Sequence, residues 1–96
     1  MKLVVSSAAL SDLERLQAFL RDKNPTAAQR AVTVLDDAMR SLDAFPQRGL
    51  LSSVPGVREL IVPFGRSAYV LRYAFLPLTD QIVILRIWHG REGQRQ

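Results

Sequence analysis

The residue run that most constrains the fold lies near the C-terminal end of the chain, where residues 81–88 are apolar at all but two positions. The run is rich in branched side chains and is too short to cross a membrane as a helix. Such a run is typical of a β-strand that is buried on both faces, so we expect it to lie inside a sheet. His89, Gly90 and Arg91 follow directly, so polar groups should reach solvent where this strand ends.

The composition indicates one globular domain. A chain of 96 residues is long enough for a single hydrophobic core, and we expect one domain over residues 1–96. The hydrophobic fraction of 48% and the charged fraction of 23% argue against disorder. No cysteine is present, which excludes disulfides and thiolate metal sites, and no apolar run reaches membrane length. We therefore expect a cytoplasmic protein with no membrane partner.

The positive charge is unevenly distributed along the chain. The formal net charge is +4, and in the second half the arginines are opposed only by Glu59, Asp80 and Glu92. A basic surface attracts nucleic acids and acidic proteins at long range, and charge alone does not distinguish the two. The arginines from residue 48 onward are Arg48, Arg58, Arg66, Arg72, Arg86, Arg91 and Arg95.

A short β-prone segment at residues 2–5 is followed by a first helix. Ser6 or Ser7 can cap a helix that begins near Ala8, and a capping box at residues 11–14 offers an alternative start one turn later. The apolar residues of this helix recur at three- and four-residue steps and form a wide arc. A helix that packs a single stripe on a sheet does not need all of them. The arc comprises Leu10, Leu13, Leu16, Phe19 and Leu20.

The next segment carries a strong signal for the start of a second helix. Asn24 is a preferred N-cap residue, and Pro25 fits the first helical position, where its missing N–H costs nothing. We expect this helix to run to about Phe45, before Pro46 and Gly49 end it. Because two or three residues join the helices, they should form an antiparallel hairpin. The apolar face of the second helix comprises Ala28, Ala31, Leu35, Ala38, Met39 and Leu42.

Three β-prone runs follow, at residues 57–62, 67–75 and 81–88. Their short connections predict hairpins, and therefore an antiparallel meander. The predicted fold class is α+β in the order β-α-α-β-β-β, with an antiparallel αα-hairpin packed on a small, mainly antiparallel sheet.

Alternation along these strands predicts which side chains share a face of the sheet. One side carries Tyr69, Leu71, Tyr73 and Phe75, and we expect the other side, with Arg72 and Arg86, to face outward. Strict alternation then exposes a sizeable apolar patch on the outward face, and such patches usually mark a partner. The patch comprises Val70, Ile82, Ile84 and Trp88.

Four stretches, in order and at matching spacing, resemble the ParE branch of the RelE/ParE superfamily of bacterial toxins. They are residues 24–28 and 42–49 at the two ends of the second helix, residues 54–60 at the entry to the meander, and residues 84–92 at its end. The resemblance implies the toxin of a type II toxin–antitoxin system, which needs no cofactor. A ParD-like antitoxin would hold the toxin inactive in a hetero-oligomer. The free toxin would arrest growth by poisoning DNA gyrase, as a binding protein and not as an enzyme.

The alternative is the other activity of the superfamily, ribosome-dependent cleavage of messenger RNA. A metal-free ribonuclease needs cations that converge on a phosphate and a group that moves protons. In the RelE-like pattern one arginine directly follows the central tyrosine of the meander, another lies just past the last strand, and an aromatic hydroxyl comes several residues later. Here Val70 follows Tyr69, and no tyrosine comes after Tyr73. Only Arg91 fits the pattern, and His89 beside it could supply the acid–base group. A third interpretation is an inert relic or an RNA-binding module of the same fold.

The resemblance and the surface pattern together predict two sets of contact residues. An amphipathic antitoxin helix should lie in the apolar groove beside the helical hairpin, followed by an extended segment against the sheet. The basic end of the meander should contact the target. The antitoxin-binding residues are expected to be Leu13, Leu16, Phe19, Leu20, Met39 and Arg72. The target-binding residues are expected to be Arg58, Arg86, Trp88, His89 and Arg91.

Some of these residues also have a purely structural interpretation. A lone histidine at the end of a strand more often ties a turn than takes part in catalysis. His89 is the sole histidine and cannot build a metal site by itself, so no metal is expected. Arg72 and Arg86 could simply pair with Glu59 or Asp80.

Overall fold

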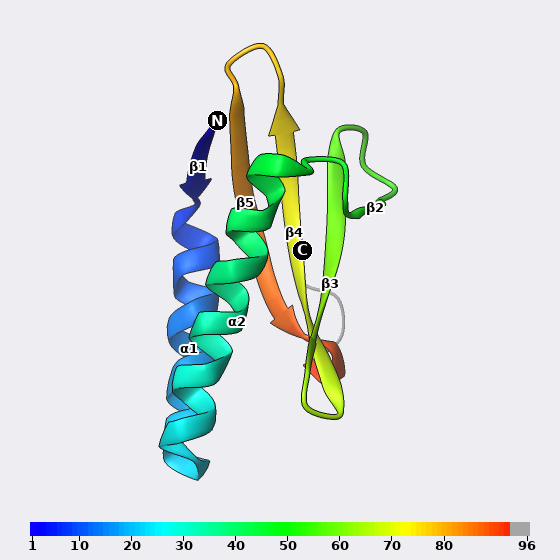
Figure 1. Cartoon of the computed structure of the whole chain (residues 1–96). Helices are drawn as coiled ribbons and strands as arrows, with labels where there is room; N and C mark the ends of the chain where they lie inside the picture. Colours follow the sequence, from blue (N-terminus) through cyan, green and yellow to red (C-terminus); the bar gives the residue numbers. More distant parts are fainter. Residues whose placement is uncertain (93–96) are drawn as a thin grey trace.

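The structure is a computed structural model that describes residues 1–92, and it has two helices packed on one face of a sheet (Figure 1). This arrangement confirms the predicted α+β class. The elements in chain order are β1 (Lys2–Val5), α1 (Ser7–Lys23), α2 (Pro25–Ala44), β2 (Leu50–Leu51), β3 (Val57–Phe64), β4 (Ser67–Leu76), β5 (Gln81–His89) and the 3-10 helix η1 (Gly90–Glu92).

Within residues 1–92 the strands form one five-stranded sheet, in the spatial order β1-β5-β4-β3-β2. β1 runs parallel to β5, and the other neighbouring pairs are antiparallel. β5 therefore lies between two strands, as its apolar sequence predicts. The sequence does not predict β2, because a strand of two residues is too short to show alternation.

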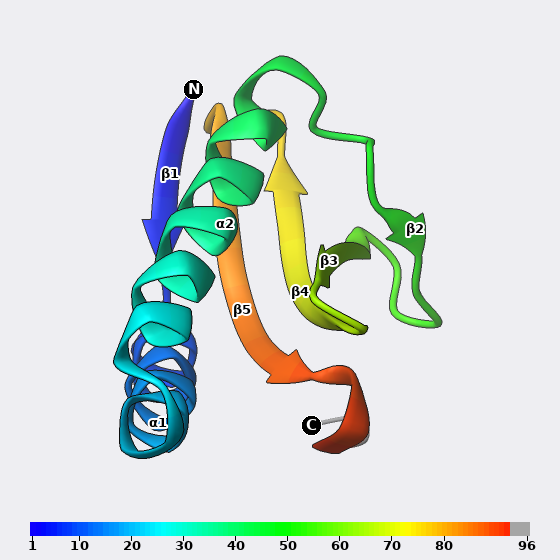
Figure 2. The same ribbon diagram turned by 60° about the horizontal axis from the view of Figure 1, so that its bottom comes forward.

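Capping residues account for the start of both helices. The Ser6 hydroxyl accepts a hydrogen bond from the Ala9 amide at 3.1 Å and caps α1, so the later start at residues 11–14 is wrong. The Asn24 side chain accepts from the Ala27 amide at 3.1 Å and caps α2, as predicted. Asn24 is the one residue between the helices, and both lie on the same side of the sheet (Figure 2). Neither helix of residues 1–92 has the apolar length needed to cross a membrane.

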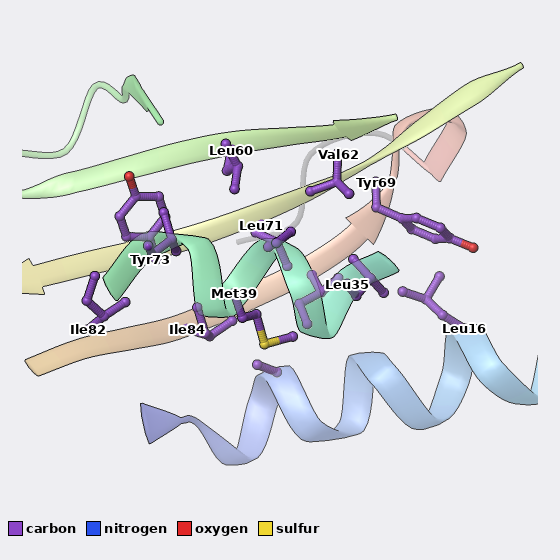
Figure 3. Close-up of a cluster of buried hydrophobic side chains, with 14 of the residues drawn as sticks. Leu16, Leu35, Met39, Leu60, Val62, Tyr69, Leu71, Tyr73, Ile82 and Ile84 are labelled. Carbon is purple, nitrogen blue, oxygen red and sulfur yellow. The ribbon is translucent and has the colours of Figure 1, made fainter. Parts of the chain in front are cut away.

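The hydrophobic core lies between the helical hairpin and the inner face of the sheet (Figure 3). α2 contributes Leu35 and Met39 to this core, and α1 contributes Leu16. Tyr73 and Tyr69 are both buried and lie toward opposite ends of this core. Because Tyr69 and Leu16 mark the same end, this end of the core lies under the C-terminal half of α1.

The predicted outward apolar patch is wrong, because β5 contains a bulge. Arg72 pairs with Arg86, but the next residue of β4, Tyr73, pairs with Ile84, so that Leu85 has no partner in β4. The extra residue reverses the alternation. Ile82 and Ile84 therefore face the core, where Ile84 is 0% exposed. Val70 and Trp88 do lie on the outer face, but both are buried, and Trp88 is only 4% exposed.

The bulge lies where α1 begins and β1 ends. The Ser6 amide donates to the Ile84 carbonyl, and the Ser6 hydroxyl donates to the carbonyl of the bulged Leu85, both at 3.0 Å. Six residues after Ser6, Asp12 of α1 accepts a hydrogen bond from the Ile87 amide at 2.8 Å. Side chains of α1 and its cap thus replace β1 as the hydrogen-bonding partners of β5, and they hold α1 against the second half of this strand.

Candidate functional site

A groove of about 430 Å³ separates the C-terminal half of α1 from the end of the sheet. One wall is a face of α1, and the other is formed by the ends of β3 and β5, the start of β4, and η1. We call this the α1–η1 groove, and both of its walls lie at the lower end of the molecule in Figure 1. The lining residues are Arg15, Leu16, Phe19, Leu20, Phe64, Tyr69, His89, Arg91 and Glu92.

The floor of the groove is apolar, and so is its α1 wall apart from Arg15. Leu16 and Tyr69 are buried at the bottom, and the Tyr69 ring packs against Phe64 with the ring centroids 5.5 Å apart. Phe19 is 61% exposed although it lies only one turn from Leu16. An aromatic side chain left this open beside a hollow offers apolar area to a binding partner. The wide apolar arc of the first helix is thus not fully covered, and its exposed Phe19 lines the groove.

The opposite wall is polar and is organised around His89. Its ring meets the edge of the Tyr69 ring at a centroid distance of 5.4 Å, and its Nδ1 accepts a hydrogen bond from the Arg91 amide at 3.2 Å. The His89 amide donates to Glu92 Oε1 at 2.7 Å. Burial, together with the charge of Glu92, raises the pKa of the Tyr69 hydroxyl. These bonds fit the expectation that His89 ties the turn after β5.

A network of four charged residues connects α1 to β5 and η1. Asp12, 2% exposed, accepts bonds from Arg86 Nε at 2.9 Å and from Arg15 Nη1 at 2.8 Å. Arg15 also makes two bonds to the Glu92 carboxylate, from Nε at 3.2 Å and from Nη2 at 3.1 Å. We refer to Asp12, Arg15, Arg86 and Glu92 as the Asp12 network.

The carboxyl of Asp12 stays ionised despite its burial. Desolvation by itself would raise its pKa, but hydrogen bonds from Arg86, the Ile87 amide and Arg15 outweigh that effect and lower the pKa from 3.8 to about 2. The bond to Asp12 raises the pKa of Arg86, and the bonds to Glu92 and to Asp12 raise the pKa of Arg15. The two arginines therefore compensate a buried charge at the edge of the groove.

The structure places the expected target-binding residues in different surroundings. His89 and Arg91 line the α1–η1 groove. Arg86 bonds to Asp12, and not to Asp80. Arg58 lies elsewhere, where its Nη1 donates to the Gly49 carbonyl at 2.8 Å. The buried Trp88 ring is on the outer face of the sheet, under the guanidinium of Arg72.

The expected antitoxin-binding residues are also divided. Leu16, Phe19 and Leu20 line the groove, and Leu13 packs against the core. Met39 is buried and borders a separate hollow near the N-terminus. Arg72 lies on the outer face and donates to Glu59 at 2.9 Å, as its structural interpretation predicts.

The sequence predictions do not include four of the lining residues, Arg15, Phe64, Tyr69 and Glu92. A signal was available for Arg15, because it lies four positions before Phe19 and so shares its helix face. Within residues 1–92, no group of three or more His, Asp or Glu side chains lies close enough together to hold a metal ion.

Comparisons with known proteins show similarity over nearly the whole chain. The sequence profile described as "ParE toxin of type II toxin-antitoxin system, parDE" matches residues 3–93. Toxin RelE1 of Caulobacter vibrioides is 43% identical over 89 residues, which cover 93% of this chain and 92% of that protein. Toxin RelE3 of the same organism is 37% identical over 84 residues, 88% of each chain.

A solved structure shares the fold. It is described as "Chromosomal ParDE TA system from P. aeruginosa", it superposes with a TM-score of 0.77 at 27% identity, and the match covers 93% of this chain and 95% of the other. The architecture of a helical hairpin on a mainly antiparallel sheet is thus that of a toxin of a toxin–antitoxin system. The chain belongs to the ParE toxin family of type II toxin–antitoxin systems.

Proposed function

We propose that a ParD-like antitoxin inactivates this toxin by laying an amphipathic helix in the α1–η1 groove. We further propose that the free toxin arrests growth in the cytoplasm by binding and poisoning DNA gyrase. The observation that carries the proposal is the groove itself, which has an exposed aromatic residue, Phe19, on one wall and a cation, Arg91, on the other.

The chemistry of the groove favours a helical partner. An amphipathic helix docks by placing apolar side chains in a hydrophobic groove and polar ones at its rim. Leu16, Phe19 and Leu20 provide an apolar wall along α1, and Phe64 closes the floor. An acidic antitoxin residue would meet Arg91 at the opposite rim. The ParDE description of the similar solved structure supports an antitoxin partner.

The charged groups at the groove favour a binding function over RNA cleavage. Arg15 and Arg86 already compensate Asp12, so they are not free to converge on a phosphate. The Glu92 carboxylate in the groove would repel a phosphate. The raised pKa of Tyr69 disfavours the deprotonated form of its hydroxyl, which is the form that would act as a general base. The exposed Arg91 and the partly exposed His89 remain as the polar groups best suited to contact a target.

One observation favours the alternative of a ribosome-dependent ribonuclease. His89, Arg91 and the Tyr69 ring line the same groove, so that a proton-moving group and a cation lie together. In that mechanism His89 would transfer the proton, and Arg91 would stabilise the negative charge that develops on the phosphate. The relatives from Caulobacter vibrioides also carry the name RelE.

The deciding experiment is a plasmid supercoiling assay with purified gyrase, into which the toxin is titrated. We expect inhibition with accumulation of cleaved DNA, reversal by added antitoxin, and a loss of roughly tenfold in potency for Arg91→Ala, the effect of one charged contact. Arg40→Ala is the matched control, because Arg40 is an exposed arginine of α2 that does not line the groove.

A parallel assay of messenger RNA cleavage on translating ribosomes tests the alternative. No effect on gyrase at large excess, together with RNA cleavage that His89→Ala abolishes, would replace the gyrase proposal by the nuclease. The groove would then be a catalytic site.

A further inference from the structure

We infer that the Arg15–Glu92 ion pair is a positioning device, which holds the turn at Gly90–Glu92 so that Arg91 is presented at the rim of the α1–η1 groove. The inference rests on the proposed target surface, but it concerns residues that do not themselves touch the target. It assigns a functional role to the Arg15–Glu92 pair, the more exposed part of the Asp12 network.

Glu92 joins three parts of the molecule at the groove. Its carboxylate accepts the two bonds from Arg15 on α1 and a third from the His89 amide at the end of β5. Arg91 lies between these tethered residues, and its own amide donates to His89 Nδ1. The amides of His89 and Arg91 are thus held by side chains of the same turn, and the Glu92 side chain ties the turn to α1.

Arg15 is itself held in place by Asp12. Its Nη1 bonds to Asp12, which is buried and also binds Arg86 and the Ile87 amide. A long exposed arginine normally loses conformational freedom when it forms an ion pair, which cancels most of the gain. Here the guanidinium is already oriented, and its planar fork meets the Glu92 carboxylate with two bonds. The pair therefore transmits the rigid position of α1 to the turn.

The turn is also fixed at its other end. A Cβ atom added to Gly90 would lie 3.3 Å from the Ala68 carbonyl oxygen, so the backbone passes close to β4 at this point. The turn thus packs against β4 at Gly90 and is tied to α1 at Glu92, and Arg91 is the exposed residue between them. Loss of the Glu92 charge weakens the tie between this turn and α1.

The test uses Glu92→Gln, which keeps the shape of the side chain and removes its charge. We expect growth arrest by the full chain, expressed from a titratable promoter in a bacterial host, to require roughly ten times more toxin than the native chain. Exchange of the His89 amide should become faster, because its acceptor is weakened. The thermal midpoint should change little, because the pair is partly exposed and glutamine keeps the shape of the side chain.

Two further variants complete the design. Arg15→Lys keeps the charge but cannot make the two-bond contact, so its loss of growth arrest should lie between those of the native chain and Glu92→Gln. Asp36→Asn is the control, because it removes an exposed ion pair with Arg40 on α2, away from the groove. We expect native growth arrest from this control.

Growth arrest does not depend on which target is correct, so the inference and the proposed function can fail separately. Native growth arrest by Glu92→Gln, with Arg91→Ala impaired, would overturn the inference alone. A thermal midpoint that falls in step with growth arrest would show a role in stability and also overturn it. Native growth arrest by Arg91→Ala would overturn the target surface, and with it the role assigned to Glu92.

Discussion

The hydroxyl of Tyr73 joins the loop after α2 to the middle of the sheet. It donates to the Pro46 carbonyl at 2.8 Å and accepts from the Gly49 amide at 2.9 Å. Gly49 must be a glycine for this contact, because a Cβ atom there would lie 2.8 Å from the Tyr73 ring. One buried side chain therefore fixes where the chain leaves the helical layer and enters the sheet.

Replacing Tyr73 with Phe should destabilise the fold by roughly 1–3 kcal/mol, because the buried Gly49 amide loses its acceptor. Urea unfolding followed by circular dichroism measures the loss. Tyr69→Phe is the matched control, since no hydrogen bond of the Tyr69 hydroxyl is found within residues 1–92, and it should have little effect on stability. An equal loss from both variants would contradict the role given to the Tyr73 hydroxyl.

Asp12 is the polar residue whose burial is hardest to predict from the sequence. On a helical wheel it belongs with the charged face of α1, and nothing in its neighbours indicates that it is buried. Its partners Arg86 and Ile87 are 74 and 75 positions away in the sequence. Burial of the carboxyl becomes acceptable only when the bulged end of β5 brings these donors to it.

At the scale of elements, α1 has two functions on one helix. Its buried residues, such as Ala9 and Leu16, pack on the sheet, whereas Phe19 remains open at the groove. The three- and four-residue spacing predicts that this apolar arc exists. Which part of the arc is covered depends on where β5 and η1 lie, so the spacing alone could not divide it.

We predict that Phe19→Ser weakens antitoxin binding by about 2 kcal/mol or more, as expected for an aromatic anchor. The variant should remain folded, because Phe19 is 61% exposed. Isothermal titration calorimetry with purified antitoxin measures the change. Leu10→Ser is the matched control, since Leu10 is 50% exposed on the same helix but does not line the groove. Equal weakening by the two variants would argue that the antitoxin lies elsewhere on α1.

The bulge in β5 determines which side chains of this strand face the core. Alternation correctly groups the residues of β4, but it fails on β5 after Ile84, because one extra residue exchanges the two faces. Nothing in the apolar run at residues 81–88 marks Leu85 as the bulged position. Its carbonyl is engaged by Ser6 at the start of α1, a contact that exists only in the folded chain.

For the molecule as a whole, the Asp12 network links the helical layer to the sheet and makes stability sensitive to acid. The folded-state pKa of Asp12 is about 2, below its ordinary value of 3.8. The unfolded chain therefore binds more protons at this site than the folded chain at pH values between these two. The stabilisation is fully present above about pH 4 and is lost as the pH falls toward 2.

We expect the free energy of unfolding to fall by about 2 kcal/mol between pH 4 and pH 2 through Asp12 alone. Urea unfolding at a series of pH values measures the total fall. The Asp12→Asn variant should be less stable at pH 4, and its free energy of unfolding should fall less between pH 4 and pH 2. Titration of the Asp12 carboxyl by ¹³C NMR provides a direct reading in the native chain. A midpoint near 4 there would contradict the account of the network.

The sequence by itself determined the order of the elements except the short β2, and with it the helical hairpin and the meander. These depend on signals between near neighbours: the cap at Asn24 with Pro25, the helical spacing of apolar residues, and short turns between β-prone runs. It also indicated that His89 and Arg91 end the last strand together. The resemblance to toxins rests on such local stretches as well, and the comparisons confirm it.

Only the tertiary structure decided which residues share a site. The position of the bulge, the burial of Asp12, and the meeting of α1 with η1 across the groove all depend on contacts between residues far apart in the chain. Such contacts are selected by packing and by the cost of leaving buried polar groups unpaired. That balance involves the whole folded chain, and no single stretch of the sequence contains it.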